Sequence, residues 1–347
     1  MNVKDCSRLD FNTWLGPSTP LDAADIPVDK PLYQYPPNFA NEFNRNSLAT
    51  IKNAQSIGFS QYLKNSYDIA PYLFYCQGIH PRAITQFFFS NPSISSALFY
   101  YYFSSISLEY LPLADAIRIL LSRIAFPADM AKVLVVLDSF ADAYYSANSF
   151  LCENKNDIVK IALAAIVFTI NKKKTKAMSS NTFLSILQNV KSSKEYKLQV
   201  YESLKERPIP LFLTFTQLIN EPNLDLKGDL VKVGSGSVLK RKKKRLFLLN
   251  GYSMQSFKDK EMTELTLNIP LVNVLTQYVP AKGKEPSHFI ISSLDNNAFG
   301  ESFSKNKKKV SKNNSYTFYA NDDDEIRNWV YALKLVSFYN SIESLTK

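Results

Sequence analysis

Residues 243–251 read KKRLFLLNG, a run that passes from basic to apolar residues and stops at an Asn-Gly pair. Asn-Gly after an apolar run is a strong signal for a β-hairpin turn. Three further stretches have the composition of strands, namely Leu265–Leu271, Phe289–Ser293 and Tyr316–Ala320. The C-terminal third of the chain is therefore predicted to form an antiparallel sheet.

A helix is predicted to close this sheet. Residues 321–325 read NDDDE, and acidic residues at a helix start complement the positive end of the helix dipole. Apolar residues then recur at Ile326, Trp329, Val330 and Leu333, which places them on one helical face. The pattern indicates a small antiparallel β-barrel capped by one C-terminal helix.

The chain before Pro222 has the spacing of helices instead. Apolar residues recur at helical intervals over residues 114–121, 133–141, 157–170 and 198–204. We therefore expect an all-α domain over residues 46–222, followed by the β domain over residues 223–347. Residues 1–45 contain six prolines with little periodicity, so this leader is predicted to be extended or disordered.

The composition excludes several kinds of enzyme. The 347 residues include nine glycines, three cysteines and two histidines, and neither GxxxxGK[ST] nor GxGxxG occurs. We expect no catalytic nucleophile, no metal site and no cofactor. Residues 1–20 lack an apolar core, and the longest apolar run is far short of the ~20 residues that cross a bilayer. A cytoplasmic, peripheral membrane location is expected.

The net charge of +10 is unevenly distributed. Residues 221–347 carry a net charge of +6, although they make up little more than a third of the chain. The basic residues form one block at 240–245 and another at 305–312. Such blocks attract nucleic acid, acidic proteins or anionic membranes, but they also occur in solvated loops and nuclear-import signals.

Residues 224–340 resemble a pleckstrin-homology (PH) domain. The likeness rests on residues 228–232 and 243–249 as the two opening strands, on residues 268–271, and on residues 325–333 as the closing helix with its tryptophan. In phosphoinositide-binding members, a lysine ends the first strand and a Lys-x-Arg opens the second. The resemblance places Lys232, Lys243 and Arg245 at these positions, with Lys240 and Arg241 beside them, and implies binding to an anionic phosphoinositide membrane.

Two features depart from the PH pattern or extend it. The tyrosine of the family's third strand is replaced by Ser256, and no arginine precedes Asn268. The lysines of residues 305–312 are predicted to lie in the loop before the last strand, where some relatives have an insertion that adds phosphate contacts.

The helical region resembles a Sec-seven (Sec7) domain. The likeness lies in the order and spacing of residues 58–63, 80–88, 113–127, 133–145, 178–183 and 198–208. A Sec7 domain followed by a PH domain is characteristic of cytohesin-like guanine-nucleotide exchange factors for Arf-family small GTPases. The resemblance implies a GTPase as partner and no covalent chemistry.

In that family a groove between helices binds the GTPase, and an acidic residue at its edge, the glutamic finger, repels the β-phosphate and competes for Mg²⁺. The resemblance places Phe126, Pro127, Phe168 and Asn171 at this groove. We expect the finger between residues 81–88 and 97–103. Residues 89–96 contain no acid, and Glu109 lies in the next loop, so the finger is predicted to be missing.

Two functional hypotheses fit these sequence features. One is a membrane-recruited regulator of an Arf-type GTPase, and the other is a catalytically inactive adaptor that keeps the groove only for binding. The aromatic residues of 87–89 and 99–103 fit either a core or a partner groove. A nucleic-acid binder is disfavoured, because the basic residues form blocks and are not interleaved with aromatic ones.

Overall fold

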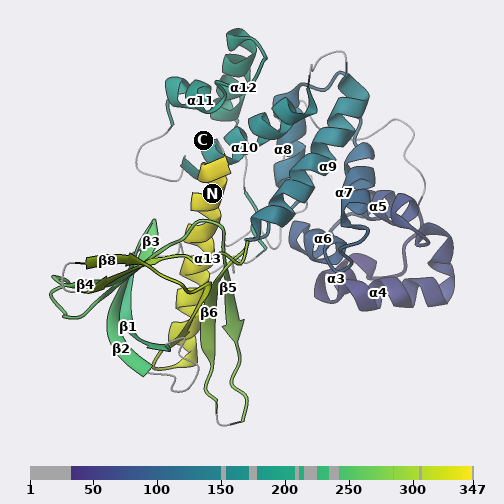
Figure 1. Cartoon of the computed structure of the whole chain (residues 1–347). Helices are drawn as coiled ribbons and strands as arrows, with labels where there is room; N and C mark the ends of the chain where they lie inside the picture. The colour runs from purple at the N-terminus through teal and green to yellow at the C-terminus, as the bar shows by residue number, and fades with distance from the viewer. Residues whose placement is uncertain are drawn as a thin grey trace. The chain divides into compact units, whose positions relative to one another are not determined.

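The computed structural model describes residues 33–149, 154–171, 178–207, 211–214, 225–233, 242–283, 285–304 and 307–345. The chain divides into two compact units. One is built from helices and contains the described residues up to Pro127 and Ala131–Thr214, and the other contains Ala128–Met130, the strands and the last helix (Figure 1). The predicted order of an all-α region before a β region is confirmed.

The helical unit contains ten α-helices among the described residues. They are α3 (Phe39–Arg45), α4 (Ser47–Ala54), α5 (Ser66–Tyr75), α6 (Pro81–Phe88), α7 (Ser95–Ser104), α8 (Leu113–Arg123), α9 (Met130–Asn148), α10 (Lys155–Asn171), α11 (Ser180–Ile186) and α12 (Lys194–Glu206). Polar side chains cap several of them. Asn65 accepts a hydrogen bond from the backbone of Asp68, and Ser193 accepts one from Tyr196.

The structure corrects the end of the predicted leader. Residues 39–45 form α3, whereas the sequence pattern indicated an extended segment up to residue 45. Phe39 and Phe43 lie one turn apart and are 2% and 0% exposed. Their rings pack against those of Tyr72 and Phe87, so burial of two aromatic side chains stabilises a seven-residue helix that is too short to form alone. Residues 1–32 of the leader lie outside the described residues.

Aromatic side chains fill much of the helical core. Phe88 stands edge-on to both Phe99 and Tyr102, and Phe103 stands edge-on to Phe140. All five rings are buried. Most aromatic residues of 87–89 and 99–103 are therefore part of the core, which was one of the two alternatives that the sequence left open.

A buried ionic cluster joins α8 to α12. Arg118 forms a 2.5 Å ion pair with Asp115 and also donates to the backbone oxygen and hydroxyl of Ser203. Asp115 accepts a second contact, at 3.1 Å, from Arg207. Because each buried charge has a partner, the cluster fixes the two helices without leaving an uncompensated charge.

The strand unit contains nine described strands and one long helix. They are β1 (Asp225–Val233), β2 (Lys242–Asn250), β3 (Ser253–Phe257), β4 (Leu265–Pro270), β5 (Val274–Val279), β6 (His288–Ser293), β7 (Glu301–Ser304), β8 (Lys307–Val310), β9 (Ser315–Tyr319) and α13 (Asp323–Leu345). The strands are antiparallel, in the order β5-β6-β9-β1-β2-β3-β4-β7-β8. The hairpin predicted at Asn250-Gly251 is confirmed by the pairing of β2 with β3.

Part of the second lysine block differs from its predicted loop. Residues 307–310 form strand β8, which pairs with β7 and places Lys308 opposite Phe303. Lys308 also forms a 2.6 Å ion pair with Glu301. Cross-strand pairing of this kind orders a segment whose lysines alone favour a solvated loop.

Helix α13 closes the sheet, as predicted. Asp322 accepts a hydrogen bond from the backbone N–H of Glu325, so the acidic run caps the first turn. Trp329 is 0% exposed and lies in the core formed with Phe247, Phe289 and Phe318. Gly228 of β1 permits this contact, because a Cβ there would lie 3.5 Å from the indole ring and 3.0 Å from Glu325 Oε1. No helix among the described residues is long and apolar enough to cross a bilayer.

We expect Trp329→Ala to destabilise the strand unit by about 3–5 kcal/mol, because it removes the largest buried side chain of the α13 contact. Denaturant unfolding followed by circular dichroism measures the loss. Asn328→Ala, at an exposed position on the same helix, is the control and should stay within about 0.5 kcal/mol of the parent chain. Equal stability of the two variants would contradict the assigned role of α13.

Candidate functional site

Three of the five basic residues predicted for anion binding lie on the first two strands of the sheet. In the β1–β2 register, Lys232 is opposite Lys243 and Leu230 is opposite Arg245. Directly opposite residues of antiparallel strands point to the same face. Lys232, Lys243 and Arg245 therefore share one face, which we call the inner face.

The same face carries the core of the unit further along the strands. Leu230, Phe247 and Leu249 belong to the inner face and are buried. Lys243 is exposed, and Lys232 and Arg245 are half-buried. Along the inner face, buried apolar side chains thus give way to the three cations. This change occurs toward the C-terminal end of β1 and the N-terminal end of β2.

The surroundings of Lys232 disfavour its positive charge. Burial lowers the pKa of Lys232, and the neighbouring charge of Lys243 lowers it further. The Lys232 ammonium lies 5.3 Å from the ring centroid of Tyr316, which offers only a cation–π contact. Among the described residues, no carboxylate is within ion-pair distance of Lys232, Lys243 or Arg245. The three cations thus share one face of the sheet and form no ion pair among the described residues.

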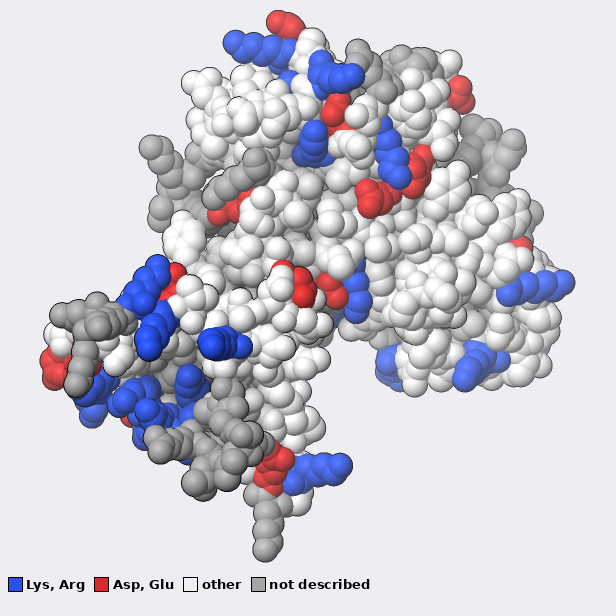
Figure 2. All heavy atoms as spheres, viewed as in Figure 1, with Lys and Arg blue, Asp and Glu red and all other residues white. Residues whose placement is uncertain are grey.

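The rest of the first basic block is divided between the two faces. Lys242 and Lys244 alternate with Lys243 and Arg245, so they lie on the opposite face of β2. Lys240 and Arg241 lie outside the described residues. Figure 2 shows lysine and arginine side chains crowded over the part of the strand unit where Figure 1 shows β1, β2, β4 and β8.

The position of Ser256 accounts for one departure from the PH pattern. Ser256 lies opposite Phe247 on the inner face and is buried. Its hydroxyl is 2.6 Å from that of Thr266, next to a register shift between β3 and β4. The serine therefore pairs inside the sheet and does not extend toward the three cations.

Phe126 and Pro127, predicted at the GTPase groove, lie in the connection between α8 and α9. Both are buried, and Phe126 is 0% exposed. Its backbone pairs with residues 212–214, through Phe126 N–H to the Phe212 oxygen at 2.8 Å and Thr214 N–H to the Phe126 oxygen at 3.0 Å. Both side chains are buried within this connection, so neither offers an exposed surface to a partner.

Phe168 and Asn171 lie on α10. Phe168 is 5% exposed and stands edge-on to Phe183 and Tyr201. Asn171 is the last residue of α10, and its side chain lies outside the described part of the chain. The described contacts of Phe168 and Phe126 involve different partners, so these contacts do not join the predicted groove residues to one another.

An acid beside the first pair of groove residues was not among the sequence predictions. Asp129 follows Pro127 by two positions, is half-buried and immediately precedes α9. The connection between α6 and α7, where the finger was expected, contains no acid. Glu109, the acid considered instead, is exposed in the connection between α7 and α8. Its position in the sequence, two residues after Pro127, is the signal that could have identified Asp129 as a candidate acid.

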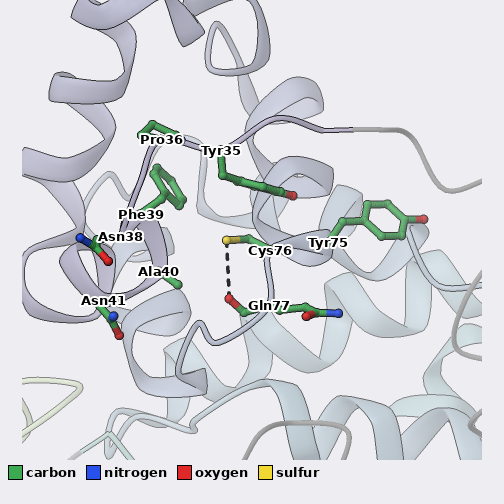
Figure 3. Close-up of a pocket in the computed structure, with 9 residues that line it drawn as sticks. All are labelled: Tyr35, Pro36, Asn38, Phe39, Ala40, Asn41, Tyr75, Cys76 and Gln77. Atoms are coloured by element: carbon green, nitrogen blue, oxygen red, sulfur yellow. Dashed lines mark hydrogen bonds between the residues drawn. The ribbon is translucent and has the colours of Figure 1, made fainter.

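A pocket of about 370 Å³ lies at the start of the helical unit (Figure 3). It is lined by Tyr35, Pro36, Asn38, Phe39, Ala40, Asn41, Tyr75, Cys76 and Gln77, none of which is charged. Burial raises the pKa of Cys76 to about 12, so its thiol stays protonated at neutral pH, and it contacts the Gln77 oxygen at 3.8 Å. This lining offers no nucleophile or acid–base pair.

Comparisons with known proteins agree with this architecture. The family model described as the Sec7 domain matches residues 36–209, and the PH domain model matches residues 224–338. The chain therefore belongs to the Sec7 domain family and carries a PH domain after it. The domain content and order predicted from the sequence are confirmed.

Solved structures similar to this chain include three Sec7 proteins. The Sec7p catalytic domain is 14% identical, with 51% of this chain and 98% of that chain covered and a TM-score of 0.46. A Sec7 domain bound to ARF1-GDP and Brefeldin A is 18% identical, with coverages of 50% and 91% and a TM-score of 0.44. A chimera of the Rickettsia prowazekii RalF Sec7 domain and the Legionella pneumophila RalF capping domain is 11% identical, with coverages of 90% and 97% and a TM-score of 0.45.

Replacing Lys243 by alanine should raise the pKa of Lys232 toward its ordinary value, because a like charge on the opposite strand is removed. NMR titration of the lysine side-chain ammonium groups measures the pKa. Lys242→Ala is the matched control, since its side chain lies on the other face of the same strand. Equal shifts in the two variants would contradict a specific Lys232–Lys243 coupling.

Proposed function

We propose that this protein is a membrane-recruited guanine-nucleotide exchange factor for an Arf-family small GTPase. The match of a Sec7 model to residues 36–209, followed by a PH domain, carries the proposal. The PH domain brings the chain to an anionic membrane, and the Sec7 domain binds the GTPase there. Residues 46–222 and 223–347 are the proposed Sec7 domain and PH domain, and the Sec7 domain is proposed to begin ten residues earlier, at residue 36, because α3 and the Sec7 match lie within the predicted leader 1–45.

Membrane recruitment is assigned to the inner face of β1 and β2. Lys232, Lys243 and Arg245 form a cluster of ammonium and guanidinium groups that fits the phosphates of a phosphoinositide headgroup. Lys240 and Arg241 are proposed to add to this positive charge from the connection between the strands. Binding of a phosphate reverses the electrostatic penalty on Lys232, because an anion favours its protonated form.

Asp129 is proposed to supply the carboxylate that exchange requires. A negative charge near the bound GDP repels its β-phosphate and competes for the Mg²⁺ ion. Asp129 starts the turn into α9, and the pairing of Phe126 with residues 212–214 fixes the backbone on its N-terminal side. Phe126, Pro127, Phe168 and Asn171 are proposed to support the GTPase groove, the three aromatic or proline side chains from within the core.

An inactive adaptor is the second candidate. The observation that favours it is the lack of any acid in residues 89–96, the position where the finger was expected from the sequence. An adaptor keeps affinity for the GTPase and for the membrane but does not accelerate nucleotide release. The role of Asp129 separates the two candidates.

We expect the full chain to accelerate GDP release from an Arf GTPase on anionic vesicles, and Asp129→Asn to reduce the rate on the order of 100-fold, because it removes the charge directed at the phosphate. Loss of fluorescence from labelled GDP measures release. Glu109→Gln, at an exposed acid, is the control and should keep the parent rate. GTPase binding without accelerated release by the parent chain would favour the adaptor.

Lys243→Ala with Arg245→Ala should weaken flotation with phosphoinositide vesicles by about 30-fold, since each cation near an anionic membrane contributes about 1 kcal/mol. A charge-matched control is Lys52→Ala with Lys194→Ala, which changes two exposed lysines of the helical unit. Undiminished flotation of the first variant would exclude the inner face as the membrane site.

A further inference from the structure

Strand β8 lies at one margin of the sheet (Figure 1). Among the described residues it pairs only with β7, so its other side is unpaired, and we call this side the open edge. Strand β5 at the opposite margin differs, because α13 contacts its start. There the Ser337 hydroxyl donates to the Val274 oxygen at 3.1 Å. An unpaired edge strand is a template on which another extended chain can pair.

The hydrogen bonds between β8 and β7 determine which backbone groups reach the open edge. Ser311 N–H donates to the Gly300 oxygen at 2.9 Å, so the backbone of Ser311 points toward β7. Backbone groups of successive residues in a strand point to alternate sides. Lys309 therefore bonds toward β7, whereas Lys308 and Val310 direct their N–H and C=O groups to the open edge.

The side chains of β8 alternate between the two faces of the sheet. One row of the inner face runs from β2 to β8 through Phe247, Ser256, Leu267, Ser302 and Lys309. Lys308 and Val310 therefore lie on the opposite face. Lys309 is exposed and has no ion-pair partner among the described residues, whereas Lys308 pairs with Glu301. Val310 is 74% exposed, although its side chain is apolar.

We propose that the open edge of β8 binds an extended peptide in which acidic and apolar residues alternate. The peptide adds as a further antiparallel strand, and its backbone bonds to the outward groups of Lys308 and Val310. An acidic side chain then lies beside Lys309 on one face, and an apolar side chain lies beside Val310 on the other. This protein contact does not depend on the proposed exchange activity or on membrane recruitment.

Charge favours an acidic peptide over a second copy of the chain. Two copies of β8 that paired antiparallel would bring the lysines of one strand next to those of the other, which is unfavourable. Lysines on an edge strand restrict self-pairing for this reason. An acidic strand converts the same lysines into attractive partners, and its apolar residues cover the exposed Val310.

A labelled octapeptide of alternating glutamate and valine should bind the full chain saturably. Fluorescence anisotropy measures the affinity. The control peptide has the same composition in two blocks, four glutamates followed by four valines. It should bind about ten-fold more weakly, because it cannot place an acid beside Lys309 and an apolar residue beside Val310 in one register.

Val310→Pro tests the backbone pairing. It removes an N–H that points to the open edge and no bond to β7, and proline is tolerated at such edge positions. Peptide affinity should fall by about ten-fold, whereas Val310→Ala keeps the N–H and should lose at most about three-fold. Lys309→Glu should weaken binding by about ten-fold, because it replaces attraction with repulsion. Circular dichroism checks that each variant keeps the sheet.

Three results would each overturn the proposal. They are no saturable binding by the parent chain, equal affinity for the two peptides, and equal affinity of Val310→Pro and Val310→Ala. If Val310→Pro does not fold, Lys309→Glu decides, and unchanged peptide affinity in that variant also rejects the site. Loss of inositol trisphosphate binding by Lys309→Glu, with peptide affinity unchanged, would instead assign Lys309 to a headgroup.

Discussion

The register that holds Lys232 opposite Lys243 is the central constraint of the strand unit. Their backbones are held opposite each other by the β1–β2 ladder, and Leu230, Phe247 and Trp329 fix that ladder from the core. The two Cα positions cannot separate without disrupting the register. The folded sheet therefore stores an unfavourable interaction at one end, which an anion relieves on binding. The proposed anion binding depends on a rigid core that keeps the backbones of these like-charged residues together.

The acid proposed for exchange is positioned by a different means. It is not held by a ladder of strands but follows a short buried segment that pairs with residues 212–214. The Asp115, Arg118 and Arg207 cluster fixes α8 to α12, the two helices that precede these paired segments. Two adjacent connections are thus anchored by one ionic cluster, and contacts far away in the sequence fix the backbone at Phe126, three residues before Asp129.

Local signals in the sequence predicted most of the architecture. The Asn-Gly turn, the acidic cap and the apolar stripe of α13 each act over a few residues, so their spacing is visible directly. Helix α3 was missed because distant partners, Tyr72 and Phe87, stabilise it. Strand β8 was missed although its partner β7 directly precedes it, because its lysines alone favour a solvated loop. The inner-face cations followed from family positions, whereas the burial of Phe126 and the division of the lysines between two faces required the register.

The pairing of Phe126 with Leu213 has a mechanical consequence. Thr214 is the last described residue of the helical unit, and its N–H donates to the Phe126 oxygen three residues before Asp129. A pulling force on the chain beyond Thr214 is borne first by this bond. Hydrogen bonds in a row that are pulled from one end break one after another. The force therefore acts on the turn that contains Asp129 before it acts on the cluster of Asp115, Arg118 and Arg207.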